Sequence, residues 1–311
     1  MRLPTPFSGR RGQADASSLL PAPFVVGVAR SGTTLLRLML DAHPELAIPP
    51  ETHFIPKLAK ALGDDPRAGD DELRERALVL LTGHRRWPDF GLDPEELRRR
   101  FDEAEPFTTG TALRAFYGLY AEGQGKPRWG DKSPSYVRRM RKVHAALPEA
   151  RFVHLIRDGR DVALSQLEVH HGADEVGEAA EEWVAGIEKA RRASRRLGDA
   201  YLEARYEDLV EDAEPVLRRV CEFTRIDYDP AMLEYHSGAE ERMASTVREL
   251  SRGDAPAVTA EQRAAQHANV SKPPQSERAG RWRRDMAPEQ QEAFESVAGA
   301  LLADLGYGLG G

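Results

Sequence analysis

The chain has 311 residues, of which 41% are hydrophobic and 31% charged, and its formal net charge is −7. This length and composition indicate a folded protein of enzyme size, with a flexible tail over residues 1–21 and one domain over residues 22–311. The negative charge argues against a general nucleic-acid-binding or anionic-membrane surface. The 44 lysines and arginines still leave enough cations for a local anion site.

Cysteine content and hydropathy bear on where the protein works. Cys221 is the only cysteine, so no intrachain disulfide can form. Residues 1–21 lack the apolar centre of a signal peptide, and no apolar run approaches the length of a membrane span. We therefore expect a cytoplasmic protein that contacts no membrane. We expect Cys221 to pack inward from the side of a helix rather than act as a nucleophile.

Strands and helices alternate along the chain, which predicts an α/β fold, a P-loop-like parallel sheet flanked by helices. The first buried strand is expected over Phe24–Val28 and the first helix from Thr34. A helical insertion is expected over about residues 60–125, where apolar residues recur at helical spacing. Its predicted helices are 71–81, 94–101 and 108–121.

The second half continues the alternation. Asp158 is expected to cap a helix that runs on from Asp161. Residues 245–276 are polar and contain prolines, so they are expected to form a long loop that orders over a ligand. The other predicted elements are strands at 151–156 and 200–206 and helices at 134–146, 173–197, 212–223, 230–236 and 288–305.

The segment Gly27-Val28-Ala29-Arg30-Ser31-Gly32-Thr33-Thr34 has the spacing of a phosphate-binding P-loop. Between a strand and a helix, such a loop presents backbone N–H groups and a helix N-terminus to an anion. Nucleoside triphosphatases carry a lysine where this chain has Thr33, and that lysine reaches the outer phosphates. A nucleotide with a single 5′-phosphate end therefore fits better than ATP. The predicted ligands are Arg30, Ser31, Gly32, Thr33 and Thr34.

A second anion site is predicted after the strand that ends at Ile156. Arg157 would lie at the carboxyl edge of the sheet, where parallel α/β sheets bind ligands. The following helix would bring Ser165 back over that edge, so a guanidinium and a hydroxyl could meet one phosphate. The alternative is a surface network of ion pairs within Arg157-Asp158-Gly159-Arg160-Asp161.

Taken together, several motifs resemble sulfotransferases that use 3′-phosphoadenosine 5′-phosphosulfate (PAPS), most closely the tyrosylprotein sulfotransferase branch. The resemblance covers about residues 22–307 and is weaker between 60 and 125. The motifs occur in the family's order and are Arg30-Ser31-Gly32-Thr33-Thr34-Leu35, Pro50-Glu51-Thr52-His53, Gly130-Asp131-Lys132-Ser133-Pro134, Arg157-Asp158-Gly159-Arg160-Asp161 with Ser165, Tyr206-Glu207-Asp208-Leu209, Lys272-Pro273, Arg281-Trp282 and Leu305-Gly306-Tyr307.

The resemblance implies transfer of a sulfonate group from PAPS to an acceptor hydroxyl, releasing 3′-phosphoadenosine 5′-phosphate (PAP). It places the general base at Glu51, with His53 as the second choice because histidine also suits proton transfer near neutral pH. It makes Lys132 and Arg30 the catalytic cations, which stabilise the charge on the leaving phosphate.

For the cofactor, the resemblance assigns the 3′-phosphate to Arg157 and Ser165. Tyr206 would lie on the adenine side, and Arg281 would be a late basic contact. Two positions depart from the family pattern, since Val169 replaces an arginine and Gln266 replaces a serine. Ser271 or Thr246 could supply the missing hydroxyl.

Two other functions compete with this interpretation. A P-loop kinase would need ATP and magnesium, but the lysine is absent and Asp158 comes one residue too late to follow the strand as a metal ligand. A catalytically inactive nucleotide-binding module would need neither Glu51 nor Lys132. The nine histidines show no zinc-site spacing, so no metal is expected. The acceptor stays open between a phenol or tyrosyl group and a small-molecule alcohol, and no nucleic acid is expected as partner.

Overall fold

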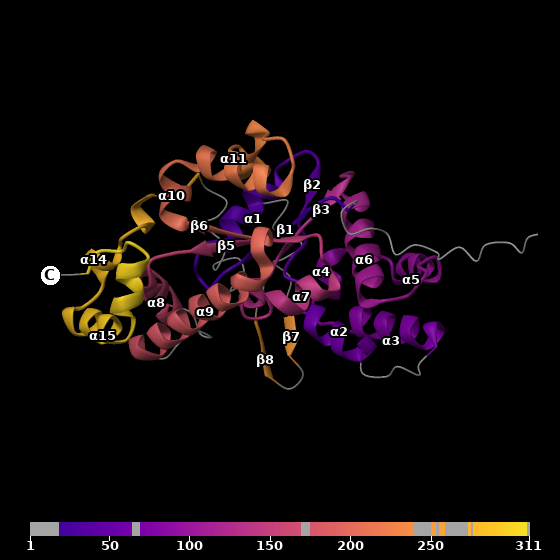
Figure 1. Cartoon of the computed structure of the whole chain (residues 1–311), viewed down its shortest axis with the longest axis horizontal. Helices are drawn as coiled ribbons and strands as arrows, with labels where there is room; N and C mark the ends of the chain where they lie inside the picture. The colour runs from indigo at the N-terminus through magenta and orange to yellow at the C-terminus, as the bar shows by residue number, and fades with distance from the viewer. Residues whose placement is uncertain are drawn as a thin grey trace, which may run out of the picture.

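The computed structural model describes residues 19–63, 69–168, 175–238, 250–252, 255–258, 273–274 and 276–309. Its centre is a four-stranded parallel sheet in the order β4-β1-β5-β6. The strands are β4 (Asp131–Lys132), β1 (Ala22–Val26), β5 (Ala150–Ile156) and β6 (Tyr201–Arg205). Helices lie around this sheet, so the predicted α/β fold is confirmed (Figure 1).

The two central strands are apolar along nearly their whole length because both faces of the sheet are covered. All residues of β1 are buried, and so is β5 apart from Arg151. Val25 and Val153 pack against α1 (Thr33–Asp41), α10 (Tyr206–Glu211) and α11 (Ala213–Thr224). Phe24 and Phe152 point to the other face and join the core of the helical insertion.

The predicted insertion is present and lies at one end of the molecule (Figure 1). Two of its helices begin at side-chain caps: the Asp93 carboxylate accepts from the Glu95 amide, and Thr108 and Thr111 form a capping box. Sequence periodicity missed α2 and α4. The helices are α2 (Ile55–Gly63), α3 (Asp70–Thr82), α4 (Trp87–Phe90), α5 (Pro94–Asp102) and α6 (Thr109–Gly123).

The opposite end of the molecule is built from later helices (Figure 1). Asp158 caps α8 (Gly159–Leu167) by accepting from the Arg160 amide, as predicted. The remaining helices are α9 (Val176–Leu197), α14 (Trp282–Asp285) and α15 (Pro288–Asp304), with the short 3-10 helices η3 (Gly198–Ala200) and η6 (Ser276–Arg278).

Three predicted elements differ from the structure. The expected helix over 134–146 is divided at Arg139, whose non-helical backbone (φ −133°, ψ 6°) separates η2 (Pro134–Arg138) from α7 (Met140–Ala146). The expected helix over 230–236 is two 3-10 turns, η4 (Pro230–Met232) and η5 (Tyr235–Gly238). Part of the expected loop over 245–276 is an antiparallel pair, β7 (Leu250–Arg252) with β8 (Ala255–Val258), and most of the rest lies outside the described residues. A further short pair that was not predicted is β2 (Leu46–Ala47) with β3 (Arg128–Trp129).

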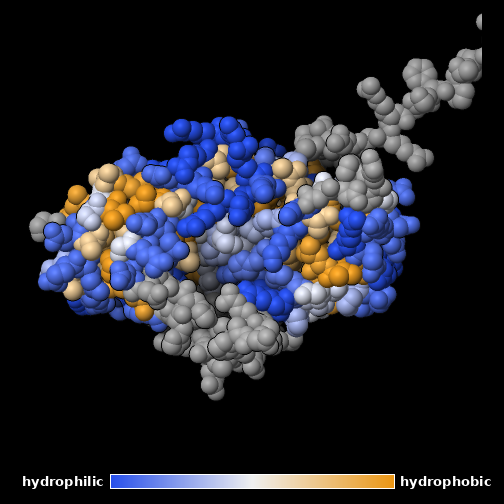
Figure 2. Space-filling model, turned by 90° about the horizontal axis from the view of Figure 1, so that it is seen from below, coloured by the Kyte–Doolittle hydropathy of each residue, from blue (hydrophilic) through white to orange (hydrophobic). Residues whose placement is uncertain are grey.

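Figure 2 shows one face on which hydrophobic residues gather toward the two ends and hydrophilic residues lie between them. Within the described ranges, no helix is both long and apolar enough to cross a bilayer.

Candidate active site

The P-loop turns sharply between β1 and α1. Arg30 and Gly32 both have positive φ, 72° and 88°, and Gly32 is the N-cap of α1. A Cβ on Gly32 would lie 2.3 Å from the Tyr206 ring, so the loop needs glycine there for both its conformation and its space. The start of α1 has no side-chain cap. Its first amides are therefore of the kind that bind an anion at a helix N-terminus.

A cavity of about 360 Å³ opens beside this loop. Eight of the predicted site residues line it: Arg30, Gly32, Thr33, Thr34, Glu51, Arg157, Ser165 and Tyr206. The structure therefore brings the P-loop, the candidate base and the predicted 3′-phosphate pair to one place. The sequence did not single out four other lining residues, Arg86, Ser135, Tyr235 and Arg278.

Glu51 and Lys132 form the contact at the centre of the site. The Lys132 amine donates to Glu51 Oε1 at 2.6 Å and to Thr34 Oγ1 at 3.3 Å. Thr34 belongs to the first turn of α1, so the contact joins the carboxylate, the cation and the P-loop helix. Lys132 is buried and is not among the cavity-lining residues, so it lies behind Glu51 and Thr34.

His53 is a hydrogen-bond partner of Glu51. Its Nε2 lies 2.7 Å from Glu51 Oε2, and its Nδ1 lies 3.2 Å from the Ser135 hydroxyl. His53 also has a positive φ of 55°, which is uncommon for a residue with a side chain. Arg86, from the insertion, places its guanidinium 3.7 Å from the same Glu51 oxygen.

These neighbours set the protonation of the pair. Burial alone would raise the pKa of Glu51, but Lys132, the His53 hydrogen bond and Arg86 together bring that pKa well below its ordinary value. Burial lowers the pKa of Lys132, and the Glu51 carboxylate opposes that effect. The carboxylate is therefore ionised at neutral pH and can accept a proton.

A buried polar network fixes the position of the Glu51 segment. The Thr52 hydroxyl donates to Asp131 Oδ2 at 2.8 Å and lies 2.9 Å from the Tyr136 hydroxyl. The Thr52 amide donates to Ser133 Oγ at 3.1 Å, and Tyr117 donates to the same Asp131 oxygen at 2.8 Å. Asp131 and Lys132 are neighbours on β4, so this network ties the segment carrying Glu51 to the strand carrying Lys132.

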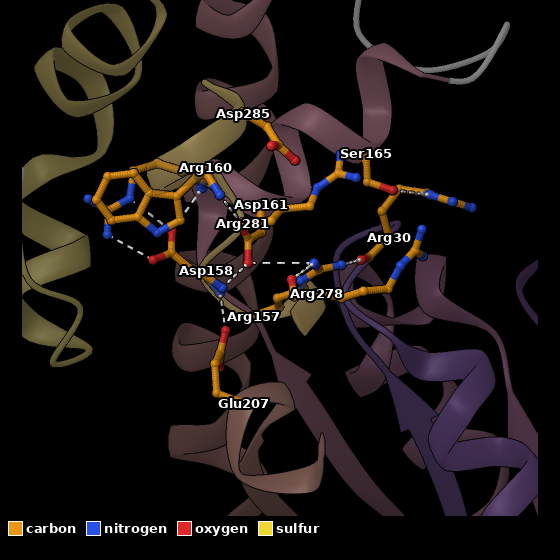
Figure 3. Close-up of polar contacts among 12 residues, drawn as sticks. Arg30, Arg157, Asp158, Arg160, Asp161, Ser165, Glu207, Arg278, Arg281 and Asp285 are labelled. Carbon is orange, nitrogen blue, oxygen red and sulfur yellow. Dashed lines mark hydrogen bonds and ion pairs between the residues drawn. The ribbon is translucent and has the colours of Figure 1, made fainter. Parts of the chain in front are cut away.

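The second half of the cavity is strongly cationic. Arg30 Nε donates to the Ser165 hydroxyl at 3.0 Å, and Arg157 donates to the carbonyl oxygens of Arg30 at 3.3 Å and of Arg278 at 2.7 Å. Figure 3 shows these residues converging from the P-loop, α8 and the segment around η6. Burial, followed by the positive charge of Arg157, lowers the pKa of Arg30, and Arg278 and Arg281 add to this effect. Such a concentration of positive charge suits a ligand with several negative charges.

The other charged residues of the Arg157–Asp161 motif hold the fold together. Arg160 is fully buried and bonds the Asp158 carboxylate through Nε at 3.0 Å and Nη2 at 2.8 Å, and Glu295 of α15 through Nη1 at 2.7 Å. Asp161 accepts the amides of Gly280 at 2.7 Å and Trp282 at 2.9 Å (Figure 3). The residues of this motif therefore have different roles: Arg157 faces the cavity, and its neighbours anchor the C-terminal segment.

Arg281 points elsewhere. Its guanidinium pairs with Glu168 at 2.6 Å, and it is not among the residues that line the cavity. Arg278, three residues earlier, lines the cavity instead. Arg278 could have been predicted from the sequence Arg-Ala-Gly-Arg, which places a second arginine three residues before Arg281. Arg86 could not have been predicted in this way, because it lies in the insertion, where the resemblance is weak.

Tyr206 lies at the end of β6, where it begins α10. Its ring packs against Gly32, and the Arg157 guanidinium lies 4.5 Å from the ring centroid. Tyr206 therefore supports the P-loop and Arg157 from the side, and its contact with adenine stays a prediction. Cys221 is buried on α11 with its Sγ 3.7 Å from Met232 Sδ, as predicted, and burial raises the pKa of its thiol to about 11.

Several sequence-based predictions fall on residues that the structure does not describe. They are Val169, Thr246, Gln266 and Ser271. Within the described part of the chain, no group of three His, Cys, Asp or Glu residues is arranged to hold a metal ion.

The sequence model of the sulfotransferase family matches residues 21–230, which contain the P-loop, Glu51, Lys132, Arg157 and Ser165. The chain belongs to the sulfotransferase family. The matched range includes the whole parallel sheet and all predicted site residues except Arg281.

Two individual relatives illustrate the similarity. A protein-tyrosine sulfotransferase of Drosophila melanogaster is 27% identical over 226 residues, covering 70% of this chain and 40% of the relative. Nodulation protein NoeE of Sinorhizobium fredii is 27% identical over 318 residues, covering 94% of this chain and 67% of the relative. The chain spans about half the length of the protein-tyrosine sulfotransferases that it matches.

Solved structures agree on the fold. The sulfotransferase domain of the Synechococcus PCC 7002 olefin synthase has a TM-score of 0.58 at 26% identity and covers 89% of this chain and 94% of its own. The sulfotransferase domain from the curacin biosynthetic pathway has a TM-score of 0.61 at 19% identity, with coverages of 94% and 99%.

Proposed function

We propose that this sulfotransferase moves a sulfonate group from PAPS to an acceptor hydroxyl, with Glu51 as general base. The observation that carries the proposal is the contact of Lys132 with both Glu51 and Thr34. This contact supports the proposal because it brings a carboxylate and an ammonium group to the start of the P-loop helix, where a 5′-phosphate would bind.

The cationic half of the cavity supports a donor with two phosphate positions. The P-loop amides, Thr33 and Thr34 are assigned to the 5′-phosphosulfate, and Arg157 and Ser165 to the 3′-phosphate. Arg30 lies between these two groups, since its side chain bonds Ser165 while its backbone belongs to the P-loop. A donor with one phosphate end would use only part of this cluster.

The proposed step is an in-line displacement at sulfur. The acceptor oxygen forms a bond to sulfur, and the bond between sulfur and the bridging phosphate oxygen breaks, so the products are the sulfate ester and PAP. The acceptor proton passes to Glu51. As negative charge develops on the bridging oxygen, Lys132 and Arg30 stabilise it.

For the acceptor, we propose a phenol or tyrosyl hydroxyl first, because several relatives are named protein-tyrosine sulfotransferases. A small-molecule alcohol is the second candidate. The acceptor would approach from the side of Glu51, His53, Ser135 and Arg86, which line the cavity together.

The test is to incubate the full chain with sulfur-35-labelled PAPS and three acceptors, a phenol, a tyrosyl peptide and an aliphatic alcohol. The expected result is transfer of label to at least one acceptor, unchanged by EDTA. Parallel reactions with ATP and magnesium test the kinase alternative. Tight PAP binding without transfer to any acceptor would favour the inactive module, and phosphate transfer from ATP would overturn the proposal.

A further inference from the structure

A basic groove of about 810 Å³ lies outside the catalytic cavity. One side is formed by the end of η2 and by α7, which contribute Arg138, Arg139, Arg141 and Lys142, all exposed. Its floor includes Val137 and Met140, which are buried. We define these residues and the facing side of α9 as the basic groove.

The facing side of the basic groove is one stripe of α9. Lys189, Arg192, Arg195 and Arg196 line it, and all four are exposed. No Asp or Glu is among the residues that line the groove. Across the part of the chain that the structure describes, Arg192 is the lining cation with an ion pair, to Glu188 at 2.9 Å.

The spacing of the arginines on α9 is unfavourable for that helix. Arg192 and Arg196 stand four residues apart on α9, and like charges at that spacing destabilise a helix. An anionic partner that bridges the two sides of the groove would remove the repulsion. The whole chain nevertheless has a net charge of −7, so the positive charge is concentrated here against a negative background.

The position of the groove links it to the cavity. Pro134 and Ser135, at the start of η2, line the catalytic cavity, while Val137 and Arg138, at the end of the same 3-10 helix, line the groove. A partner held in the groove is therefore one short helix away from the place where the acceptor hydroxyl would bind.

We propose that the basic groove docks an acidic amphipathic helix of a partner protein. Glutamates and aspartates on the helix would meet the two cationic sides, and small apolar side chains between them would face Ala145 and Ala193, the apolar lining residues that are not buried. The stripe from Lys189 to Arg196 spans about 10 Å, roughly two helical turns. The docking itself does not depend on the sulfonate donor, so it can be tested separately from the proposed function.

Two other anionic partners fit less well. No aromatic residue lines the groove for stacking of nucleic-acid bases, and the chain's net charge of −7 disfavours a long polyanion. A bilayer is flat and requires apolar side chains that can insert, whereas the groove is concave and its apolar floor is buried.

The test measures binding of a fluorescein-labelled peptide of about 18 residues in which Glu flanks an Ala stripe, a length sufficient for a helix. Fluorescence anisotropy is recorded with the full chain at low and high NaCl. The expected result is binding that weakens with salt and falls roughly tenfold in the double variant R141E/R196E. The matched control R218E/R219E makes the same change in net charge at two exposed arginines of α11 and is expected to bind like the parent.

Far-UV circular dichroism and urea denaturation of each variant provide the check on folding, which does not depend on the proposed sulfonate transfer. Equal loss of peptide binding in both variants, or no peptide binding, would overturn the proposal. Groove-dependent binding of a 20-nucleotide single-stranded DNA or of phosphatidylglycerol vesicles, tighter than that of the peptide, would overturn the choice of partner.

Discussion

The substitution Thr52→Val tests whether the buried network positions the catalytic base. Thr52 is fully buried, and valine keeps its shape but removes the hydroxyl that contacts Asp131 at 2.8 Å and Tyr136 at 2.9 Å. A hydrogen bond to a charged group contributes about 1.5–3 kcal/mol and one between neutral groups about 0.5–1.5 kcal/mol. We therefore expect the free energy of unfolding to fall by about 2–4 kcal/mol.

The effect on catalysis follows from the position of Glu51 next to Thr52. Loss of the anchor should displace the carboxylate from Lys132 and lower kcat by roughly 10- to 100-fold, since small misplacements at a reacting centre are costly. The matched control is Thr224→Val, because the equally buried Thr224 hydroxyl bonds only carbonyls of its own helix. The assays are urea denaturation and steady-state turnover. Equal destabilisation of both variants, or unchanged kcat in Thr52→Val, would refute the positioning role.

Three further predictions concern the loop, the donor and the base. Gly32→Ala should lower the free energy of unfolding by at least about 1–2 kcal/mol, because Gly32 has a positive φ, and should weaken PAP binding, because the new methyl group would clash with Tyr206. The control Gly118→Ala, in open space on α6, should cause neither loss. Denaturation and calorimetry on both variants compare them. Arg157→Ala should weaken PAP binding about 10- to 100-fold but AMP binding much less, because the lost contact belongs to the 3′-phosphate; equal losses by calorimetry would contradict that assignment. Because Lys132 and the other neighbours lower the pKa of Glu51, its carboxylate stays ionised as the pH falls from about 8 to 5. Protonation of Glu51 should therefore cause no loss of kcat/KM over this pH range. A loss centred near pH 6–7, where histidines titrate, would point to another base.

The sequence predicted the parts of the fold that depend on local pattern. The buried strand of β5, the Asp158 cap and the helices of the insertion with clear periodicity lie within a few residues of their predicted limits. The two-residue strands β2, β3 and β4 are too short to show any periodicity, so only tertiary pairing reveals them. The break at Arg139 likewise leaves no apolar signal.

The candidate site was predictable where motifs fix both residue type and spacing. Glu51 and Lys132 lie far apart in the sequence, and the resemblance assigned each of them a role; their direct contact is seen only in the structure. The sequence could not show that Lys132 is buried, nor that Arg86 of the insertion approaches Glu51, because both depend on packing between distant segments. The contacts of Arg160 and Asp161 with the C-terminal segment could not be predicted for the same reason.

The central claim is that Glu51 is the base of a sulfonate transfer. The most direct measurement compares Glu51→Gln with His53→Ala, recording PAP affinity by calorimetry and turnover with PAPS and the best acceptor. Glutamine keeps the volume of the side chain and leaves the arginine cluster intact, so PAP binding should persist while turnover falls by about 10²–10⁴-fold. His53→Ala should retain more activity, because His53 supports the carboxylate through one hydrogen bond. Near-normal turnover in Glu51→Gln together with an inactive but PAP-binding His53→Ala would contradict the account and make His53 the base.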